Sequence, residues 1–431
     1  MCNSNDTKPG CKEYRQVSRR RFLGLTAGTL AAAATPGWLP KVVFADSHNG
    51  SRDVLVSIFL RGGMDSLSVC VPFGEENYYR LRPNIAVPRP DSSLPGAALD
   101  LDGFFGLNPA LSPLLEAYQN EDLLLVHAAG NLDPTRSHFQ AMNSMEVGMP
   151  EPPGNLVTGW LGRHLASTAP TLEDAALRAI NLGFGLPRTL VGGPKTLPVD
   201  DPANYGLIGD PQANALRQVE LETLYSRHTE PLKTSAANNF RTIDLLDQID
   251  FPGYQPTGGA SYGDDELGQA LKSTAALIRA DVGVEAVHID VGGWDTHDFQ
   301  GTLDGTLFTL LTYLGQGLAA LHADLATSDR KVTTVAMSEF GRNVFENGSL
   351  GTDHGHGSMM IAMGGGIAGG RVLSEWPGLE DGQLYEGQDL AITTDYRDVL
   401  TEIVTRCLGN PDFRNVFPDT GYSPNLLGVT R

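Results

Sequence analysis

Two short segments near the C-terminal end combine carboxylates with imidazoles. Asp295 and His297 lie two residues apart, on a turn that opens with Gly292 and Gly293. His354 and His356 are also two apart and follow Asp353, with glycines between and after them. Carboxylate oxygen and imidazole nitrogen are common ligands of divalent metals, and glycine lets the backbone approach an ion closely. The two segments therefore predict a metal site.

Two further carboxylates are expected at the same place. Asp65 follows the apolar run 53–60, and Glu339 follows the apolar run 331–337. The carboxyl ends of parallel strands share one edge of a sheet, which is where α/β proteins build their sites. Carboxylates gathered there raise one another's pKa unless a cation neutralises them. This demand favours a metal, although a turn-stabilising role for Asp65 is the simpler alternative.

A hydroxyl nucleophile is expected at the start of a helix. Thr135, Arg136 and Ser137 follow the apolar run 123–128 and open a helical pattern over 135–147. A hydroxyl at a helix N-terminus can attack an ester while the free N–H groups and Arg136 hold the anionic oxygens. We favour Ser137 over Thr135. The alternative is that either hydroxyl only caps the helix.

Apolar runs alternate with helical patterns along most of the chain. This alternation predicts a doubly wound α/β fold, with a largely parallel sheet and helices on both faces. A glycine-rich turn at 364–369 fits a nucleotide-binding pattern, but no helix is predicted after it, so we interpret it as a turn. Strands are predicted at 53–60, 123–128, 176–182, 284–291, 331–337 and 359–363, and helices at 135–147, 211–228, 232–249, 265–280, 303–326 and 395–408.

The N-terminal segment 1–45 resembles a twin-arginine export signal. Arg19 and Arg20 precede an apolar run, 25–34, that is too short to span a membrane, which needs about 20 residues. Small residues before position 46 predict cleavage after Ala45. We therefore expect a periplasmic or extracellular protein that engages the twin-arginine translocation machinery and has no stable membrane anchor. The remainder, 46–431, is predicted to be one domain, with an insertion or cap around 154–258.

The net charge argues against one class of partner, and the cysteine content limits the possible disulfides. Cleavage removes seven of the 31 Lys and Arg and two of the 51 Asp and Glu, which leaves 24 against 49, a formal charge of −25. So acidic a surface argues against a nucleic-acid partner. Only Cys70 and Cys407 remain after cleavage. They either stay free or form a single disulfide.

Taken together, these motifs resemble an uncharacterised family of exported bacterial proteins, known as a domain of unknown function, that is similar to the alkaline phosphatase and sulfatase superfamily. The resemblance covers essentially the whole mature chain. The segments that carry it are the export signal and residues 59–65, 135–139, 159–163, 292–297, 338–342 and 353–355.

The resemblance implies a metal site at the carboxyl ends of the strands and phosphoryl or sulfuryl transfer through a hydroxyl or a modified cysteine. Asp65 matches the first-strand carboxylate ligand, and Ser137 or Thr135 matches the nucleophile. Asp295 with His297 matches the Asp/His ligand pair, and His354 the late histidine ligand. Phe340, beside Glu339, stands where a histidine is usual, which implies that one of two metal subsites is altered or lost.

We therefore expect an exported, metal-dependent hydrolase that acts on a small anionic ester of phosphate or sulfate. The metal is expected to be zinc, with calcium, magnesium or manganese as alternatives. The other hypothesis is a non-catalytic binding or assembly protein on the same fold.

Overall fold

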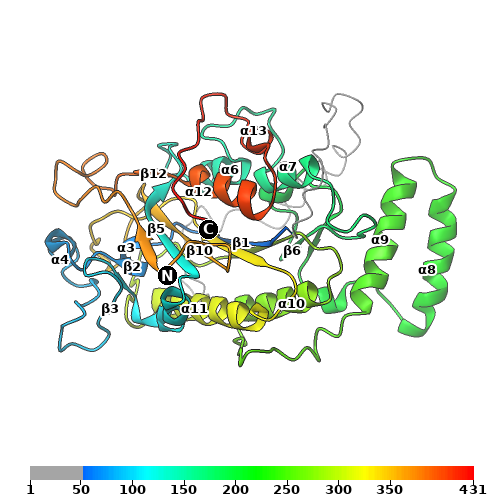
Figure 1. Ribbon diagram of the computed structural model, residues 1–431, viewed down its shortest axis with the longest axis horizontal. Helices are drawn as coiled ribbons and strands as arrows, with labels where there is room; N and C mark the ends of the chain where they lie inside the picture. The colour runs from blue at the N-terminus through cyan, green and yellow to red at the C-terminus, as the bar shows by residue number, and fades with distance from the viewer. Residues whose placement is uncertain (1–51) are drawn as a thin grey trace, which may run out of the picture.

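A central sheet positions the parts of the molecule (Figure 1). The computed structural model describes residues 52–431, and within them this sheet has nine strands in the order β11-β5-β10-β9-β1-β8-β6-β7, with β12 also beside β5. The strands are β1 (Val54–Leu60), β5 (Leu123–Gly130), β6 (Ala179–Leu182), β7 (Thr196–Val199), β8 (Ala286–Val291), β9 (Val332–Met337), β10 (Ser358–Met363), β11 (Arg371–Leu373) and β12 (Thr394–Asp395).

Strand β1 lies between β8 and β9 and is parallel to both. All seven of its residues are buried. Successive side chains point to opposite faces of a sheet, so Val56 and Ile58 join the hydrophobic core on one face, while Leu55 and Phe59 join the core on the other. An unbroken apolar run is what a strand buried on both faces requires.

Helices cover both faces of the sheet (Figure 1). Helices α10 (Glu266–Arg279) and α11 (Thr306–Leu325) lie on one face. The opposite face is covered by α6 (His138–Val147), α7 (Trp160–Ser167) and α12 (Tyr396–Glu402), the last of which continues as a π-helical turn, Ile403–Cys407. The predicted α/β class with a mostly parallel sheet is confirmed.

A second, three-stranded sheet and several short elements were not predicted. The small sheet has the order β2-β4-β3. These elements are β2 (Cys70–Val71), β3 (Leu99–Asp100), β4 (Gly106–Leu107), α3 (Ser66–Val69), α4 (Glu76–Leu81), α5 (Leu115–Gln119), α13 (Phe413–Val416) and 3-10 turns at Pro109–Leu114, Arg188–Leu190 and Pro202–Asn204.

Strand β10 runs against its neighbours. It pairs antiparallel with both β5 and β9. The chain passes from β9 to β10 through the loop 338–357 without a crossover helix, and a strand that returns from the same edge has to be antiparallel. As a result, the start of β10 lies at the edge where β1, β8 and β9 end.

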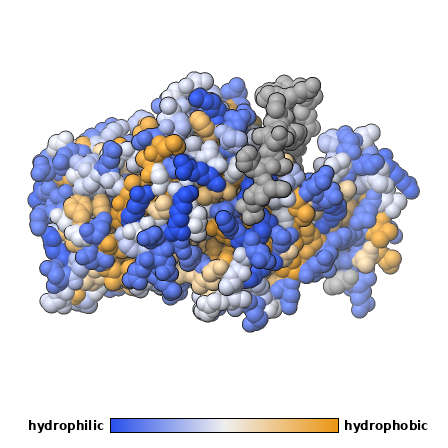
Figure 2. All heavy atoms as spheres, viewed as in Figure 1, coloured by the Kyte–Doolittle hydropathy of each residue, from blue (hydrophilic) through white to orange (hydrophobic). Residues whose placement is uncertain are grey.

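Within the segment predicted as an insertion or cap, β6 and β7 join the main sheet. Helices α8 (Pro211–Ser226) and α9 (Leu232–Asp247) pack on each other as a hairpin that projects from one end of the molecule (Figure 1). The face seen in Figure 2 mixes hydrophilic and hydrophobic residues, on the hairpin as elsewhere.

Three further expectations concern the chain outside the sheet. The turn at 364–369 is confirmed, because strand β11 and no helix follows it. Cys70 and Cys407 are both free and buried. The predicted signal and its cleavage site lie outside the described residues. Within 52–431, no helix has both the length and the apolar character needed to cross a membrane.

Candidate metal centre

Three segments meet at the carboxyl edge of the sheet. They are the turn after β8, the loop between β9 and β10, and the start of α6. Gly62, after β1, allows this close approach: its φ is +128°, and a Cβ there would lie 2.4 Å from the backbone nitrogen of Asp295. Only glycine, which has no Cβ, can adopt this φ and also lie this close to the backbone of Asp295.

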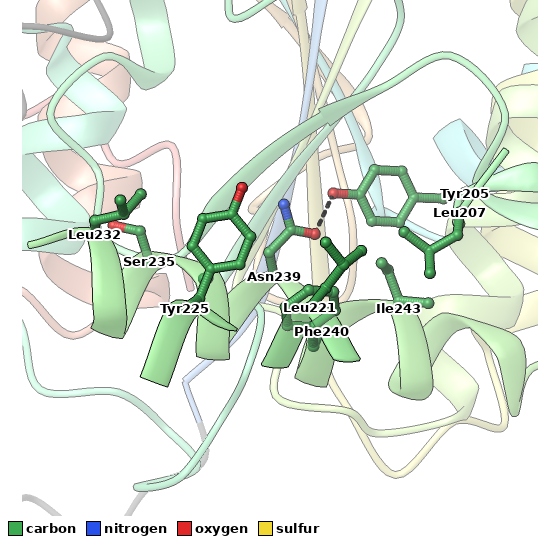
Figure 3. A pocket seen from close by; sticks show the side chains of 11 residues that line it. Tyr205, Leu207, Leu221, Tyr225, Leu232, Ser235, Asn239, Phe240 and Ile243 are labelled. Carbon is green, nitrogen blue, oxygen red and sulfur yellow. Dashed lines mark hydrogen bonds between the residues drawn. The ribbon is translucent and has the colours of Figure 1, made fainter. Parts of the chain in front are cut away.

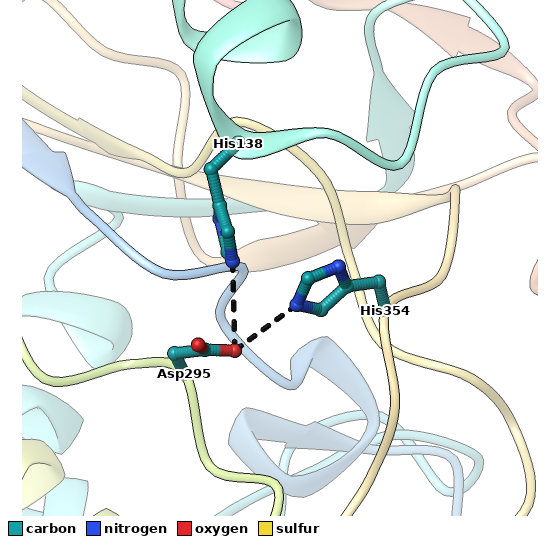
Figure 4. Close-up of side chains that lie close together, drawn as sticks. All are labelled: His138, Asp295 and His354. Carbon is teal, nitrogen blue, oxygen red and sulfur yellow. Dashed lines mark hydrogen bonds and ion pairs between the residues drawn. The ribbon is translucent and has the colours of Figure 1, made fainter. Parts of the chain in front are cut away.

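His138, Asp295 and His354 form the core of the candidate centre (Figure 4). The Nε2 atoms of both histidines and one carboxylate oxygen of Asp295 all lie within 4.8 Å of one another. From Asp295 Oδ1, His354 Nε2 is 3.2 Å away and His138 Nε2 is 3.6 Å away. Among residues 52–431, this is the one group of three or more potential ligands close enough to share an ion.

His297 adds a third imidazole. Its Nε2 lies 3.1 Å from Asp295 Oδ1 and 3.0 Å from His354 Nε2. Four ligands placed tetrahedrally at roughly 2.0–2.1 Å from zinc are about 3.3 Å from one another. The separations from Asp295 Oδ1 to the three histidines and between His297 and His354, 3.0–3.6 Å, are close to this spacing, but the group whose ligand atoms all lie within 4.8 Å of one another does not include His297.

Each of the three histidines is oriented by a bond to its other ring nitrogen. Carbonyl and ionised carboxylate oxygens only accept hydrogen bonds, so in each ring Nδ1 carries the proton and the neutral ring keeps a lone pair on Nε2. Metal-binding histidines are held in this way. The acceptors are Glu339 Oε1 for His138 (2.8 Å), Asp353 Oδ1 for His297 (2.8 Å) and the backbone oxygen of Arg136 for His354 (2.9 Å).

This arrangement requires positive charge. Two neutral rings would set the lone pairs of His297 and His354 against each other at 3.0 Å and against the carboxylate of Asp295. Only protons or a cation can relieve that repulsion. In addition, Nε2 of His138 is buried and makes no hydrogen bond, since its ion-pair partner Asp295 Oδ1 lies 3.6 Å away. The orphaned nitrogen and the donor set of imidazoles and carboxylate both fit a divalent metal.

The pKa values show how strongly the groups interact when protons supply this charge. Burial raises the pKa of Asp295, but the surrounding histidines and Arg342 outweigh it and hold the pKa far below its usual range. Burial lowers the pKa of His138, but Asp295 and Glu339 raise it to about 9. A metal at the centre would take the place of these protons.

Arg342 ties the segments of the centre together and is fully buried. It donates to Asp295 Oδ1 at 2.6 Å and to the backbone oxygens of Gly63, Thr352 and Trp294 at 2.6, 2.9 and 3.0 Å. With its donors bonded inside the protein, Arg342 fixes the carboxylate and the loops rather than facing a substrate.

Asp65, a predicted ligand, lies in a separate buried ion pair. Its two carboxylate oxygens bind the guanidinium of Arg82 at 2.7 and 2.9 Å, and Oδ2 also accepts from the side chains of Ser68 and Gln300. Burial raises the pKa of Asp65, but Arg82 outweighs it and lowers the pKa overall. Its carboxylate is engaged by these partners and is not part of the cluster.

Three other predicted ligands also lie outside the cluster. Glu339 and Asp353 bind the Nδ1 atoms of histidines instead of pointing at the shared centre. His356 stacks on Tyr385, with ring centroids 4.1 Å apart, and burial lowers its pKa to about 4. The rings of His354 and His356, although two residues apart, therefore lie in different surroundings.

The candidate nucleophile segment precedes α6 directly. Ser137 is the N-cap residue, but its side chain makes no capping hydrogen bond. The hydroxyl of Thr135 donates to Gln140 at 2.7 Å. Of the two, Ser137 has the hydroxyl less committed to the protein.

Arg136 is held by carboxylates. Its guanidinium binds Asp389 at 2.5 and 3.0 Å and Glu386 at 2.7 Å. The side chain is therefore a tie to the 385–389 segment, while its carbonyl orients His354.

His138 is the member of the centre that the sequence did not reveal as a ligand. It is the first residue of α6, where a histidine is easily interpreted as part of the helix. The available signal was its position, because a helix that begins at the carboxyl edge of the sheet brings its first turn to the same edge.

A cavity elsewhere in the molecule lacks such chemistry (Figure 3). It has a volume of about 430 Å³ and lies between α8, α9 and the segment around Tyr205. Its lining is mainly apolar, and the hydroxyl of Tyr205 donates to Asn239 at 2.9 Å. It contains no histidine or carboxylate, so it is separate from the centre.

Comparisons with known proteins give one family match. Residues 215–406 match the family model described as "Protein of unknown function (DUF1501)". The matched segment includes Asp295, His297 and His354 but not His138. The comparison with curated proteins gives no match.

Several solved structures are remotely similar. The C-terminal periplasmic domain of EcEptC from Escherichia coli, in complex with zinc, is 10% identical with a TM-score of 0.33, over 76% of this chain and 77% of that one. A protein of the alkaline phosphatase superfamily from Vibrio parahaemolyticus is 12% identical with a TM-score of 0.33, over 81% and 70%. The alkaline phosphatase of the Antarctic bacterium TAB5 is 10% identical with a TM-score of 0.29, over 74% and 93%.

Proposed function

We propose that this protein is a metal-dependent hydrolase of phosphate or sulfate esters. The observation that carries the proposal is the convergence of three oriented Nε2 atoms on one oxygen of Asp295. One of these histidines, His138, directly follows Ser137, a hydroxyl residue at a helix N-terminus. The sequence motifs that resemble the alkaline phosphatase and sulfatase superfamily support the choice of ester.

In this proposal His138, Asp295 and His354 hold one divalent ion, and His297 supplies a fourth ligand. A site rich in imidazole favours zinc over calcium, magnesium or manganese, which prefer oxygen. When bound, the ion would supply Lewis acidity that offsets the negative charge developing on the ester oxygens.

The residues around the ion provide positioning and the nucleophile. The free N–H groups at the start of α6 hold the anionic group of the ester beside Ser137. The Ser137 oxygen attacks phosphorus or sulfur, and the alcohol leaves with a proton. Water then cleaves the Ser137 ester and restores the hydroxyl.

Metal content and turnover test the proposal together. We expect one zinc per mature chain, hydrolysis within a panel of aryl phosphates and aryl sulfates, and loss of both metal and turnover in His138→Ala and His354→Ala. His228→Ala is the matched control, because His228 is exposed on the projecting hairpin. A mature protein that binds no metal rules the proposal out, and full turnover in Ser137→Ala rules out the nucleophile.

A non-catalytic metal-binding protein is the second candidate. It is favoured by the state of Arg136, the basic side chain next to Ser137, which is bound to two carboxylates and does not face an ester. Stoichiometric zinc binding without turnover of any phosphate or sulfate ester would support this candidate over the hydrolase.

We further propose that the protein is exported by the twin-arginine pathway and is periplasmic or extracellular. N-terminal sequencing of the exported protein should begin at Asp46, and export should stop when Arg19 and Arg20 are both replaced by Lys. Export of that double variant would contradict the assignment.

A further inference from the structure

Two large apolar residues beside the candidate centre have an unusual backbone. Phe299 has φ +45° and Leu350 has φ +58°. Their exposed fractions are 73% and 41%. The left-handed region is unfavourable for bulky L-residues, and glycine or asparagine occupies it at lower cost. Neither residue contributes a buried side chain to the core that would offset this cost.

Backbone hydrogen bonds place the two residues side by side. The N–H of Phe299 donates to Ser349 at 2.8 Å, and the N–H of Gln300 donates to Leu350 at 2.9 Å. The segments 297–300 and 349–352 therefore run next to each other. Strained residues that the surrounding structure holds in place are concentrated at ligand sites.

This pair of segments includes the proposed ligand His297 and adjoins Asp353, which orients it. His297 precedes Phe299 by two residues, and Asp353 follows Leu350 by three. Asn347 joins them, because its side chain donates to the carbonyl of His297 at 2.9 Å and to Asp353 at 3.2 Å. The two strained apolar residues thus lie at the border of the candidate centre.

Two more exposed aromatic residues lie on the segments that form the candidate centre. Phe139 directly follows His138 and is 50% exposed, and Phe345 is 37% exposed in the loop that carries Asp353. We call Phe139, Phe299, Phe345 and Leu350 the apolar rim. Its members come from the three segments that supply the metal ligands.

We propose that the apolar rim binds an aryl or long alkyl group on the alcohol side of the ester, so that the protein prefers esters of apolar alcohols. The proposal rests on the proposed function, because the ester itself would be held at the metal. A small apolar group is a better occupant of the rim than an anionic membrane surface. The chain carries a formal charge of −20, and an anionic surface would repel it.

Inert phosphonates test this preference without turnover. The mature, zinc-loaded protein is titrated by calorimetry with methyl-, phenyl- and octylphosphonate. We expect the phenyl and octyl compounds to bind at least tenfold more tightly than the methyl compound. Phe299→Gly and Leu350→Gly should reduce this advantage about fivefold each, with methylphosphonate changed less than twofold.

The choice of glycine in Phe299→Gly and Leu350→Gly separates a loss of binding from a loss of folding. It relieves the unfavourable φ, so thermal stability should not fall, and weaker binding of the apolar compounds then reports the lost side chain. Phe299→Tyr keeps the ring and should retain the preference. Leu216→Ala, which removes a 72% exposed leucine from α8, is the matched control and should leave the affinity for all three phosphonates unchanged.

The outcomes separate the rim from the proposed hydrolase. Equal affinity for methyl and phenyl compounds, no binding of any phosphonate, or an equal loss for both in the glycine variants overturns the rim. Preference for the apolar compounds without turnover of any ester removes the hydrolase and leaves the rim. Turnover that is unchanged across all esters in the glycine variants removes the rim and leaves the hydrolase.

Discussion

At the scale of single residues, each histidine of the centre depends on the group that accepts a hydrogen bond from its Nδ1 atom. Asp353 is exposed and accepts from His297 Nδ1, so its removal leaves the core intact. We expect Asp353→Ala to weaken zinc binding about tenfold, because the ring loses the bond that fixes its orientation, and Asp353→Asn to weaken it less. A competition titration with a zinc chelator measures both.

The control for this variant is Asp298→Ala. It removes the same charge from the neighbouring residue of His297, and Asp298 is exposed. An equal loss of affinity in Asp298→Ala would show that net charge, and not the bond to Nδ1, is responsible.

The Asp65 carboxylate allows a direct test between a ligand and a structural ion pair. Asp65→Asn leaves the buried guanidinium of Arg82 without its counter-charge, which typically costs about 3–5 kcal/mol of unfolding free energy. Urea unfolding should show this loss, while zinc affinity of the folded variant stays unchanged. A drop in zinc affinity with little loss of stability would instead make Asp65 a ligand.

At the scale of elements, the β1 turn has to come very close to the turn after β8. We expect Gly62→Ala to displace that turn and to lower both zinc affinity and thermal stability, because the new Cβ would lie 2.4 Å from Asp295 N. Gly103→Ala separates strain from collision, since Gly103 also has a positive φ, +86°, but nothing lies within 4 Å of its Cβ.

The Gly103 variant should lose about 1 kcal/mol of stability and none of its zinc affinity. If the two alanine variants behaved alike, the close approach at Gly62 would not be what positions Asp295.

Local sequence patterns predicted the strands and helices better than they predicted which side chains contact one another. The apolar run of β1 and the alternation with helices were sufficient for the fold class, because a strand buried on both faces has few polar residues. Asp295 and His354 were identifiable as candidates since each flanks a strand at the correct edge. For His354, this holds because β10 is antiparallel, a direction that depends on pairing and not on local sequence.

The partners of charged residues depend on tertiary contacts and could not be predicted. Asp65 and Glu339 lie at the expected edge, yet Arg82 reaches Asp65 from 17 residues further along the chain and His138 reaches Glu339 from 201 residues away. Sequence spacing carries no information about these encounters. His138 was missed for the same reason, because its role follows from where α6 begins in space.

At the scale of the whole molecule, the net charge opposes the approach of the proposed substrate. A chain of formal charge −20 attracts cations and repels anionic esters. The centre concentrates basic groups at one edge of the sheet, with Arg342 and three histidines around Asp295. In our proposal, a metal at this centre increases the local positive charge and so offsets the repulsion that the rest of the surface imposes on an anionic ester.

Buried neutral histidines make the whole molecule sensitive to acid. Burial lowers the pKa of His164 to about 3, helped by the charges of Arg52 and Arg178, and burial lowers that of His127 to about 4. The unfolded chain takes up these protons below a pKa of about 6.5, and the folded protein does not. The free energy of unfolding is therefore complete above that pH and falls as the pH drops towards 4, by about 1.4 kcal/mol per pH unit and histidine.

Urea unfolding between pH 7 and pH 4.5 should show a shallower pH dependence of the unfolding free energy in His164→Gln than in the native protein. His228→Gln, at an exposed position, should leave the dependence unchanged, and an equal slope in both variants would show that His164 is not a source of the acid sensitivity.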